Sequence, residues 1–202
     1  MNKIKLKVGI TGNIGSGKST FAKFLSEKRY PVIQADEISK EILLNDPLAK
    51  KKIIKEFGAN TFQGNIINTR YLSEQVFSDI QRLKKINSIL HPLVRKKIDV
   101  ITAELFRTND IVFIEAALIF ESKLTKMFDY IVLITSEMNV RLNRAMIKNK
   151  LSEKDFSNRN KNQIDDKKKI KNSDFVFTNN GSLEELKLKA DLLLSILKTH
   201  PY

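Results

Sequence analysis

A glycine-rich stretch near the amino terminus, Gly12-Asn-Ile-Gly-Ser-Gly-Lys-Ser19, restricts the fold more than any other part of the chain. It satisfies the pattern G-x-x-x-x-G-K-[ST] in full, between a short β-branched run at residues 5–11 and a helical pattern at residues 18–28. A strand, a glycine-rich turn and a helix in this order direct backbone N–H groups at a phosphate. The stretch therefore predicts an α/β protein that binds a nucleoside triphosphate.

The residue types of this phosphate loop each have a chemical use. Lys18 is expected to bridge the β- and γ-phosphates, and the Ser19 hydroxyl is expected to bind Mg²⁺. The nucleotide contacts are predicted at Asn13, Ile14, Gly15, Ser16, Gly17, Lys18, Ser19 and Thr20. GTPases, motor ATPases and small-molecule kinases share such a loop, so the loop alone does not identify the phosphate acceptor.

Four further short apolar runs predict the remaining strands of a sheet. They lie at residues 31–35, 111–114, 130–135 and 175–178. These runs are apolar on both faces, which is typical of a parallel sheet that helices cover. We therefore expect a three-layer α/β/α core with a five-stranded parallel sheet.

Two long helical stretches interrupt this alternation of strands and helices. Residues 37–106 are too long for one crossover helix and predict an inserted helical lobe, with the run FGANTFQGNIINT as its main loop. Residues 141–171 predict a second helical insertion with a break near residues 149–152, and residues 183–197 predict a closing amphipathic helix. We expect one domain, with a core of residues 1–36, 107–140 and 172–202, a lobe at 37–106 and a lid at 141–171.

The positive charge of the chain is concentrated in the second insertion. The net charge is +13, and residues 141–171 contain eleven Lys or Arg and four Asp or Glu. Arg144 and Lys148 lie four residues apart, on one helical face, and Arg159 follows them. Such cations can cover a triphosphate, neutralise the transferring group and exclude water, as in a kinase lid. The alternative is a solvated basic helix.

Composition argues against several other classes of protein. A nucleic-acid-binding ATPase is expected to place aromatic residues among its cations, but residues 141–171 contain only Phe156. The NKNQ run at residues 160–163 is not a guanine-recognition motif of a GTPase. The chain has no cysteine and no apolar run of about 18 residues, so we expect a cytoplasmic protein without nucleic-acid or membrane partners.

Four side chains outside the loop leave two interpretations open. Asp36 follows the second strand and is interpreted either as a carboxylate that accepts a hydroxyl proton or holds Mg²⁺, or as the N-cap of the next helix. His91 is either a packed core histidine or a substrate contact. Glu115 ends a strand near the expected Mg²⁺, whereas Glu121 is equally suited to pair with a lid cation.

In order and spacing, several stretches resemble the dephospho-CoA kinase family over nearly the whole chain. They are VGITGNIGSGKST, PVIQADEI, FGANTF, VFSD, ILHPLV, EAALIFES, RAMIKNKLSEKDFSNRNKNQ and DFVFTNNGSLEEL. The resemblance implies transfer of the ATP γ-phosphate to the ribose 3′-hydroxyl of dephospho-CoA, with Mg²⁺, on a core similar to the nucleoside monophosphate kinases. We expect a monomer or a small homo-oligomer.

The same resemblance assigns roles to particular residues. It implies Asp36 as general base, Arg144 as the lid arginine, and Arg159 and Gln163 as further lid residues. The lobe with His91 would bind dephospho-CoA. The loop Asn179, Asn180 and Gly181 would lie near the adenine.

The chain departs from the family pattern at four positions. Lys148 stands where a second lid arginine is usual, followed by Asn149 in place of Asp, and lysine lacks the planar fork of arginine. Ala117 replaces a proline, and Thr69 replaces an arginine, although Arg70 is adjacent.

Another nucleotide kinase of the same architecture is the nearest alternative. Such an enzyme is expected to carry more arginines in the lobe than the three at Arg70, Arg82 and Arg95.

Overall fold

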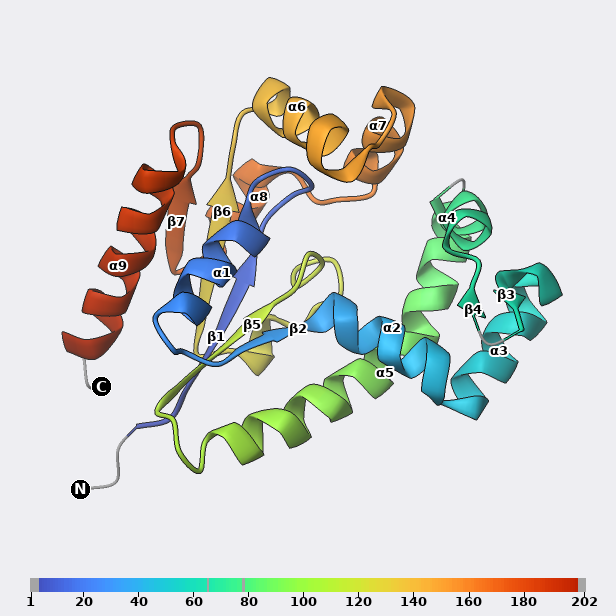
Figure 1. Ribbon diagram of the computed structural model, residues 1–202, viewed down its shortest axis with the longest axis horizontal. Helices are drawn as coiled ribbons and strands as arrows, with labels where there is room; N and C mark the ends of the chain where they lie inside the picture. Colours follow the sequence, from blue (N-terminus) through green and yellow to red (C-terminus); the bar gives the residue numbers. More distant parts are fainter. Residues whose placement is uncertain (1–3, 65, 78, 200–202) are drawn as a thin grey trace. The chain divides into compact units, whose positions relative to one another are not determined.

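The computed structural model describes residues 4–64, 66–77 and 79–199. These residues form two compact units (Figure 1). One contains the described residues up to Gln34 together with those from Thr102 onward, and the other is Ala35–Ile101. Each unit has its own buried hydrophobic cluster, so each is described separately.

The first unit is built on a five-stranded parallel sheet. Its strands are β1 (Leu6–Thr11), β2 (Val32–Gln34), β5 (Ile111–Glu115), β6 (Tyr130–Thr135) and β7 (Phe175–Thr178), in the order β2-β5-β1-β6-β7. Every neighbouring pair is parallel, and Ile10 of β1 lies opposite Glu115 of β5. The predicted five-stranded parallel sheet is confirmed.

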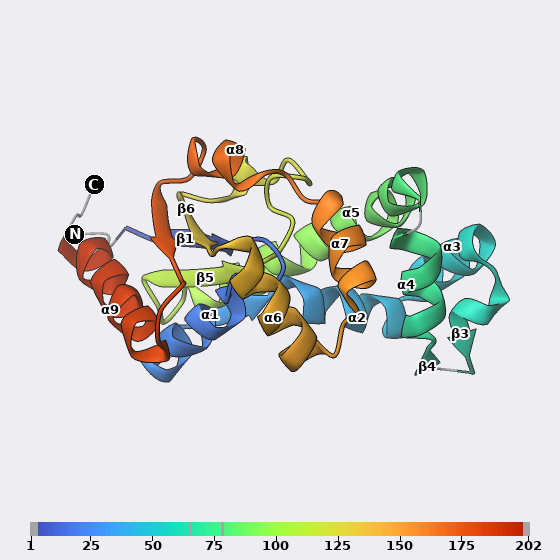
Figure 2. The same ribbon diagram turned by 90° about the horizontal axis from the view of Figure 1, so that it is seen from above.

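Helices cover both faces of this sheet, as the three-layer prediction requires. The helices of this unit are α1 (Lys18–Glu27), α6 (Met138–Asn149), α7 (Glu153–Lys161), α8 (Asp166–Ile170) and α9 (Leu183–Thr199), with a short 3₁₀ turn η2 (Thr125–Met127). The helices α1 and α9 pack on one face, where Phe21, Leu25 and Leu193 are fully buried, and α8 lies on the other face (Figure 2). The residues of β5 and nearly all of those of β6 are buried on both faces, so these apolar runs show no alternation. The edge strand β7 instead alternates half-buried and exposed residues.

The second unit is mainly helical. It contains α2 (Ala35–Asn45), α3 (Pro47–Phe57), α4 (Thr69–Phe77) and most of α5 (Ile80–Leu105), with a short 3₁₀ turn η1 (Ala59–Thr61). Its core includes Leu43, Ile53, Phe57, Leu72 and Leu90.

The interpretation of residues 57–69 as a loop was wrong. Phe62–Gln63 (β3) and Ile66–Ile67 (β4) form an antiparallel pair in which Phe62 is buried. Two-residue strands are too short to show a period in the sequence, which is why the hairpin was missed.

The expected position of Asp36 at the end of a strand was also wrong. The strand β2 ends at Gln34, and α2 begins at Ala35, so Asp36 lies in the first turn of the helix and is not its N-cap. A carboxylate in a first helical turn is favoured by the positive end of the helix dipole.

In the described part of the chain, no helix is both long enough and apolar enough to cross a membrane.

Candidate active site

The phosphate loop joins the carboxyl end of β1 to the start of α1, which is the edge where open parallel sheets bind ligands. Gly15 and Gly17 have left-handed backbones, with φ of 79° and 97°. A Cβ on Gly15 would collide with the carbonyl of Arg141, and one on Gly17 with the amide of Asn179. Since no side chain of the described residues caps α1, its first N–H groups are available to a phosphate.

Lys18 and Ser19 meet a buried carboxylate at this edge. The Lys18 Nζ lies 3.5 Å from the Glu115 Oε1, and the Ser19 hydroxyl donates to the same oxygen at 3.2 Å. Glu115 is only 4% exposed and ends β5, next to β1 in the sheet. A hydroxyl and a carboxylate are the oxygen donors that Mg²⁺ prefers, so these two residues fit a magnesium ion held jointly with nucleotide phosphates.

Arg144 lies beside the loop after β7. The family resemblance implies that this loop lies near the adenine. The Arg144 Nη1 donates to the carbonyl of Asn179 at 2.7 Å and to the Ser136 hydroxyl at 3.4 Å. The Asn179 amide donates to the carbonyl of Ser16 at 2.8 Å, and Asn180 accepts from Ser136 at 2.9 Å. Three groups of predicted site residues, in the phosphate loop, in α6 and after β7, are therefore linked directly.

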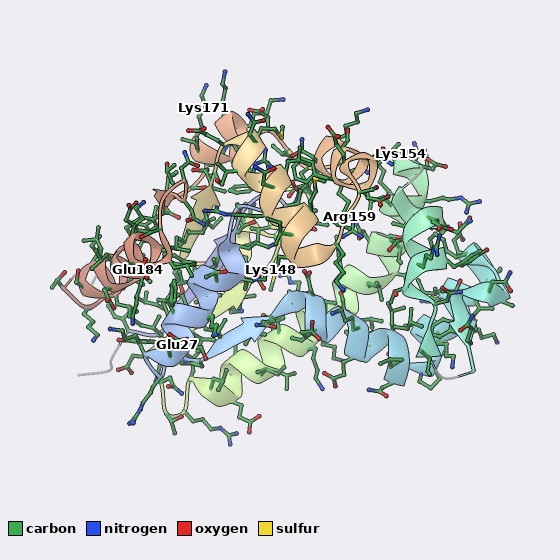
Figure 3. All side chains as sticks on the ribbon, turned by 45° about the horizontal axis from the view of Figure 1, so that its top comes forward. Glu27, Lys148, Lys154, Arg159, Lys171 and Glu184 are labelled. Carbon is green, nitrogen blue, oxygen red and sulfur yellow. The ribbon has the colours of Figure 1, made fainter. Side chains whose placement is uncertain are left out.

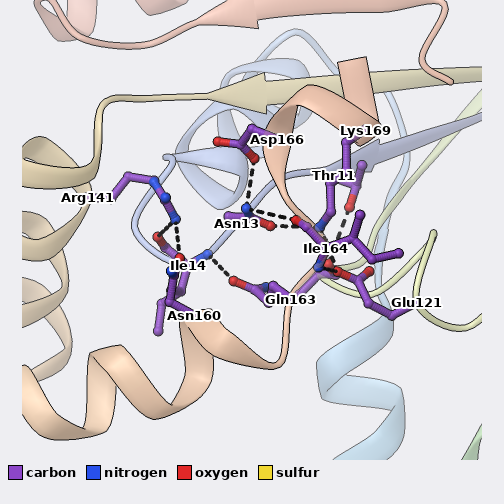
Figure 4. Close-up of polar contacts among 11 residues, drawn as sticks. Thr11, Asn13, Ile14, Glu121, Arg141, Asn160, Gln163, Ile164, Asp166 and Lys169 are labelled. Atoms are coloured by element: carbon purple, nitrogen blue, oxygen red, sulfur yellow. Dashed lines mark hydrogen bonds and ion pairs between the residues drawn. The ribbon is translucent and has the colours of Figure 1, made fainter. Parts of the chain in front are cut away.

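Residues of the predicted lid also hold the first half of the phosphate loop (Figure 4). The Ile14 N–H donates to the Gln163 side chain at 2.8 Å, and the Asn13 amide donates to Asp166 at 2.8 Å. Burial raises the pKa of Asp166, an effect that Arg141 and Lys169 oppose.

Arg141 contacts the phosphate loop, although it was not singled out from the sequence. It is buried, donates to Asn160 at 2.8 Å and to the carbonyl of Ile14 at 3.4 Å, and its pKa is lowered by that burial. Its spacing from Arg144 on one helix is the signal that would have placed both on the same face.

The other predicted lid cations differ in their exposure (Figure 3). Lys148 is exposed in the last turn of α6 and has no polar partner among the described residues. Arg159 lies in the last turn of α7, is half-buried, and has its pKa lowered by burial. Two predicted nucleotide contacts lie outside the lid. Gly181 follows β7 and is exposed, and Thr20 lies half-buried in the first turn of α1.

Two predicted site residues belong to the second unit. Asp36 is exposed in the first turn of α2. His91 is half-buried in α5, and this burial lowers its pKa.

Comparison with protein-family models covers nearly the whole chain. The model described as dephospho-CoA kinase matches residues 6–185. The chain belongs to the dephospho-CoA kinase family. The family resemblance and the expected kinase class are confirmed.

Individual proteins and solved structures align with the chain along most of their length. The dephospho-CoA kinase of Oceanobacillus iheyensis is 35% identical over 192 residues, which cover 94% of this chain and 96% of that protein. A solved structure from Thermus thermophilus superposes with a TM-score of 0.80 at 32% identity, covering 96% of this chain and 99% of the other. The dephospho-CoA kinase from Campylobacter jejuni gives a TM-score of 0.70 at 27% identity, with coverage of 96% and 98%.

The departures from the family pattern lie in ordinary local structure. Ala117 accepts a hydrogen bond from the Thr11 hydroxyl at 3.4 Å through its carbonyl. Thr69 begins α4, and the adjacent Arg70 is paired with Glu74 at 3.2 Å.

Proposed function

We propose that this member of the dephospho-CoA kinase family transfers the γ-phosphate of ATP to the ribose 3′-hydroxyl of dephospho-CoA. The observation that carries the proposal is the meeting of Lys18 and Ser19 with the buried Glu115 carboxylate beside a complete phosphate loop. In a chain of this family, such an arrangement supplies a cation for the transferring phosphate and oxygen ligands for its metal.

The nucleotide contacts of the proposal come from the phosphate loop and the start of α1. Gly15 and Gly17 have left-handed backbones, and no described side chain caps the first N–H groups of α1. These N–H groups can therefore bind the β-phosphate. The Lys18 ammonium then exchanges its ion pair with Glu115 for contacts to the β- and γ-phosphates. Asn179, Asn180 and Gly181 would contact the adenine, an assignment that rests on the family resemblance.

Ser19 and Glu115 would hold Mg²⁺ together with the phosphates. When bound, this ion neutralises charge on the phosphate oxygens. The buried carboxylate of Glu115 already accepts the Ser19 hydroxyl at 3.2 Å, so the two oxygens lie side by side.

Asp36 is the proposed general base for the acceptor hydroxyl. Its carboxylate is exposed, follows β2 by two residues and is held on the first turn of α2. A carboxylate in hydrogen-bonding reach of the 3′-hydroxyl accepts its proton as the bond to phosphorus forms. His91 and Arg159 are proposed to contact dephospho-CoA, and Arg144 and Lys148 to neutralise the triphosphate.

We also propose that the protein acts in the cytoplasm as a monomer or a small homo-oligomer. The absence of cysteine supports a reducing compartment.

The experiment that tests the proposal is ADP release from Mg²⁺ and ATP, with dephospho-CoA, AMP, CMP and shikimate offered separately. We expect turnover with dephospho-CoA alone. Asp36→Asn is expected to reduce this turnover by about 10²-fold or more, the usual contribution of a general base. Glu37→Gln, which removes the neighbouring exposed carboxylate of the same helical turn, should retain it. Turnover with another acceptor, or equal loss in both variants, would contradict the proposal.

A further inference from the structure

The short helix α8 carries three consecutive lysines with very different environments. Lys167 and Lys168 are exposed, whereas Lys169 is fully buried. A charged ammonium is costly to bury unless it is paired and hydrogen-bonded. The contacts of Lys169 therefore show what the buried charge holds in place.

Lys169 contacts one residue of the phosphate loop and one carboxylate (Figure 4). Its Nζ lies 2.7 Å from the Asn13 Oδ1 and 2.8 Å from the Glu121 Oε1. The same Glu121 oxygen accepts the backbone N–H of Ile164 at 2.8 Å. Glu121 therefore joins the ammonium to the segment that precedes α8. The sequence had left open a pairing of Glu121 with a lid cation, and Lys169 is that cation.

Lys169, Asp166 and the carbonyl of Ile164 together orient the Asn13 side chain. Lys169 donates to its amide oxygen, while its amide nitrogen donates to Asp166 at 2.8 Å and to the carbonyl of Ile164 at 3.3 Å. The next residue, Ile14, is held through its own N–H by Gln163 at 2.8 Å. The first half of the phosphate loop is thus anchored to residues 163–169, while the second half begins α1.

A buried ion pair contributes little net stability, because its desolvation cost offsets most of the attraction between the charges. Removing one partner is destabilising, but replacing both by apolar residues is often neutral. If the Glu121–Lys169 pair served stability alone, two well-chosen apolar side chains would replace it without loss.

We propose that Lys169 and Glu121 are positioning residues for ATP: their ion pair holds Asn13, and through Asn13 the phosphate loop, in the conformation that binds the triphosphate. In this role both residues act through Asn13 and not through a contact of their own with the nucleotide. The inference rests on the proposed function only in that the loop binds ATP.

The test compares nucleotide affinity with thermal stability. Binding of a non-hydrolysable ATP analogue with Mg²⁺ is measured by calorimetry, and the unfolding temperature is measured for the same samples. Lys169→Met should lower both the affinity and the unfolding temperature. The double variant Lys169→Met/Glu121→Leu should unfold at a higher temperature than Lys169→Met, because it leaves no buried carboxylate without its cation. It should still bind the analogue about tenfold or more weakly than the wild type, since a hydrogen bond to a charged group is large enough for that factor.

Two further variants keep the result interpretable. Lys168→Met removes the same charge from an exposed position of α8 and should behave as the wild type. Asn13→Ala keeps the ion pair but removes its link to the loop, so it should weaken binding of the analogue about tenfold. This variant tests the proposal even if the double variant does not fold. In steady-state kinetics, Asn13→Ala should raise the KM for ATP and leave the KM for dephospho-CoA unchanged.

Recovery of both stability and affinity in the double variant, or unchanged affinity in Asn13→Ala, would overturn the proposal. Because analogue binding needs no acceptor, this outcome is distinct from a failure of the proposed function. That failure would appear as wild-type protein that binds the analogue but does not phosphorylate dephospho-CoA.

Discussion

Single residues of the phosphate loop are constrained by both backbone conformation and neighbours. Gly15 has φ of 79°, and the carbonyl of Arg141 occupies the space that a Cβ would need. Gly64, in the turn between β3 and β4, has φ of 63° but no atom within 4 Å of the corresponding point. Both glycines have a positive φ, but only Gly15 is crowded at the position of a Cβ.

Alanine substitutions at these two glycines separate the two effects. Gly64→Ala should reduce the free energy of unfolding by about 1–2 kcal/mol, the cost of a left-handed backbone with a side chain. Gly15→Ala should reduce the free energy of unfolding by more than this. It should also lower the affinity for ATP, because the loop must move away from Arg141. Urea unfolding and calorimetry measure the two quantities. Equal loss of stability in both variants, with ATP affinity retained, would contradict the crowding at Gly15.

His91 makes the stability of the protein depend on pH. Burial lowers its pKa from 6.5, so the unfolded chain binds a proton at a higher pH than the folded chain does. The free energy of unfolding should therefore fall as the pH drops through 6.5. His91→Gln should show a smaller fall than the wild type between about pH 7.5 and about pH 5.5, measured by urea unfolding. An identical fall in the free energy of unfolding of both proteins would rule out His91 as the source of the pH dependence.

At this scale, the sequence predicted the residues that belong to a contiguous motif. Lys18 and Ser19 follow from the phosphate loop alone. The partner of Glu121 did not follow, because residues 141–171 contain eleven cations and burial of Lys169 depends on how α8 packs. The geometry of Arg141 and Asn160 depends in the same way on the packing of α6 and α7.

Individual elements followed from the sequence where their pattern was long enough. The strands at residues 130–135 and 175–178 have the predicted bounds. The second strand was predicted to extend to residue 35, but α2 begins there because the chain turns directly from strand into helix. This absence of a connecting loop places Asp36 on a helix.

The helix α3 depends on an N-cap that can be tested separately from activity. The Asp46 carboxylate accepts the N–H groups of Leu48 and Ala49, each at 2.9 Å. Asp46→Ala should lower the free energy of unfolding by about 1 kcal/mol. Lys52→Ala, at an exposed position of α3, should change it by less than about 0.5 kcal/mol. Chemical denaturation measures both, and an equal effect would argue against the cap.

The helices α6, α7 and α8 are expected to respond to the substrates as a group. Asn160, Gln163 and Asp166 lie in hydrogen-bonded contact with the loop or with Arg141. Amide hydrogen exchange in residues 141–171 should slow when an ATP analogue and dephospho-CoA bind together. Exchange in α9 serves as the control, because α9 packs on the opposite face of the sheet from α8. An exchange rate in residues 141–171 that stays unchanged when both ligands bind would contradict the lid assignment.

The whole molecule combines an α/β unit with a smaller helical unit that interrupts it in sequence. The five strands along the chain and the long helical stretch between the second and third strands were predictable, because both are read from the alternation of apolar runs and helical patterns. The order of the strands within the sheet was not predicted. The acceptor was not predictable from that architecture, which many kinases share. The prediction of the acceptor came from the order of short stretches that resemble the family. The match to residues 6–185 confirmed the family.

The most direct measurement is to identify the product formed from ATP and dephospho-CoA by the wild-type protein. We expect a product heavier by one phosphoryl group, with a new phosphorus resonance coupled to the ribose 3′ proton, and one ADP for each product molecule. A control without protein should form none. ADP release without a phosphorylated acceptor, or phosphate on a different hydroxyl, would contradict the account.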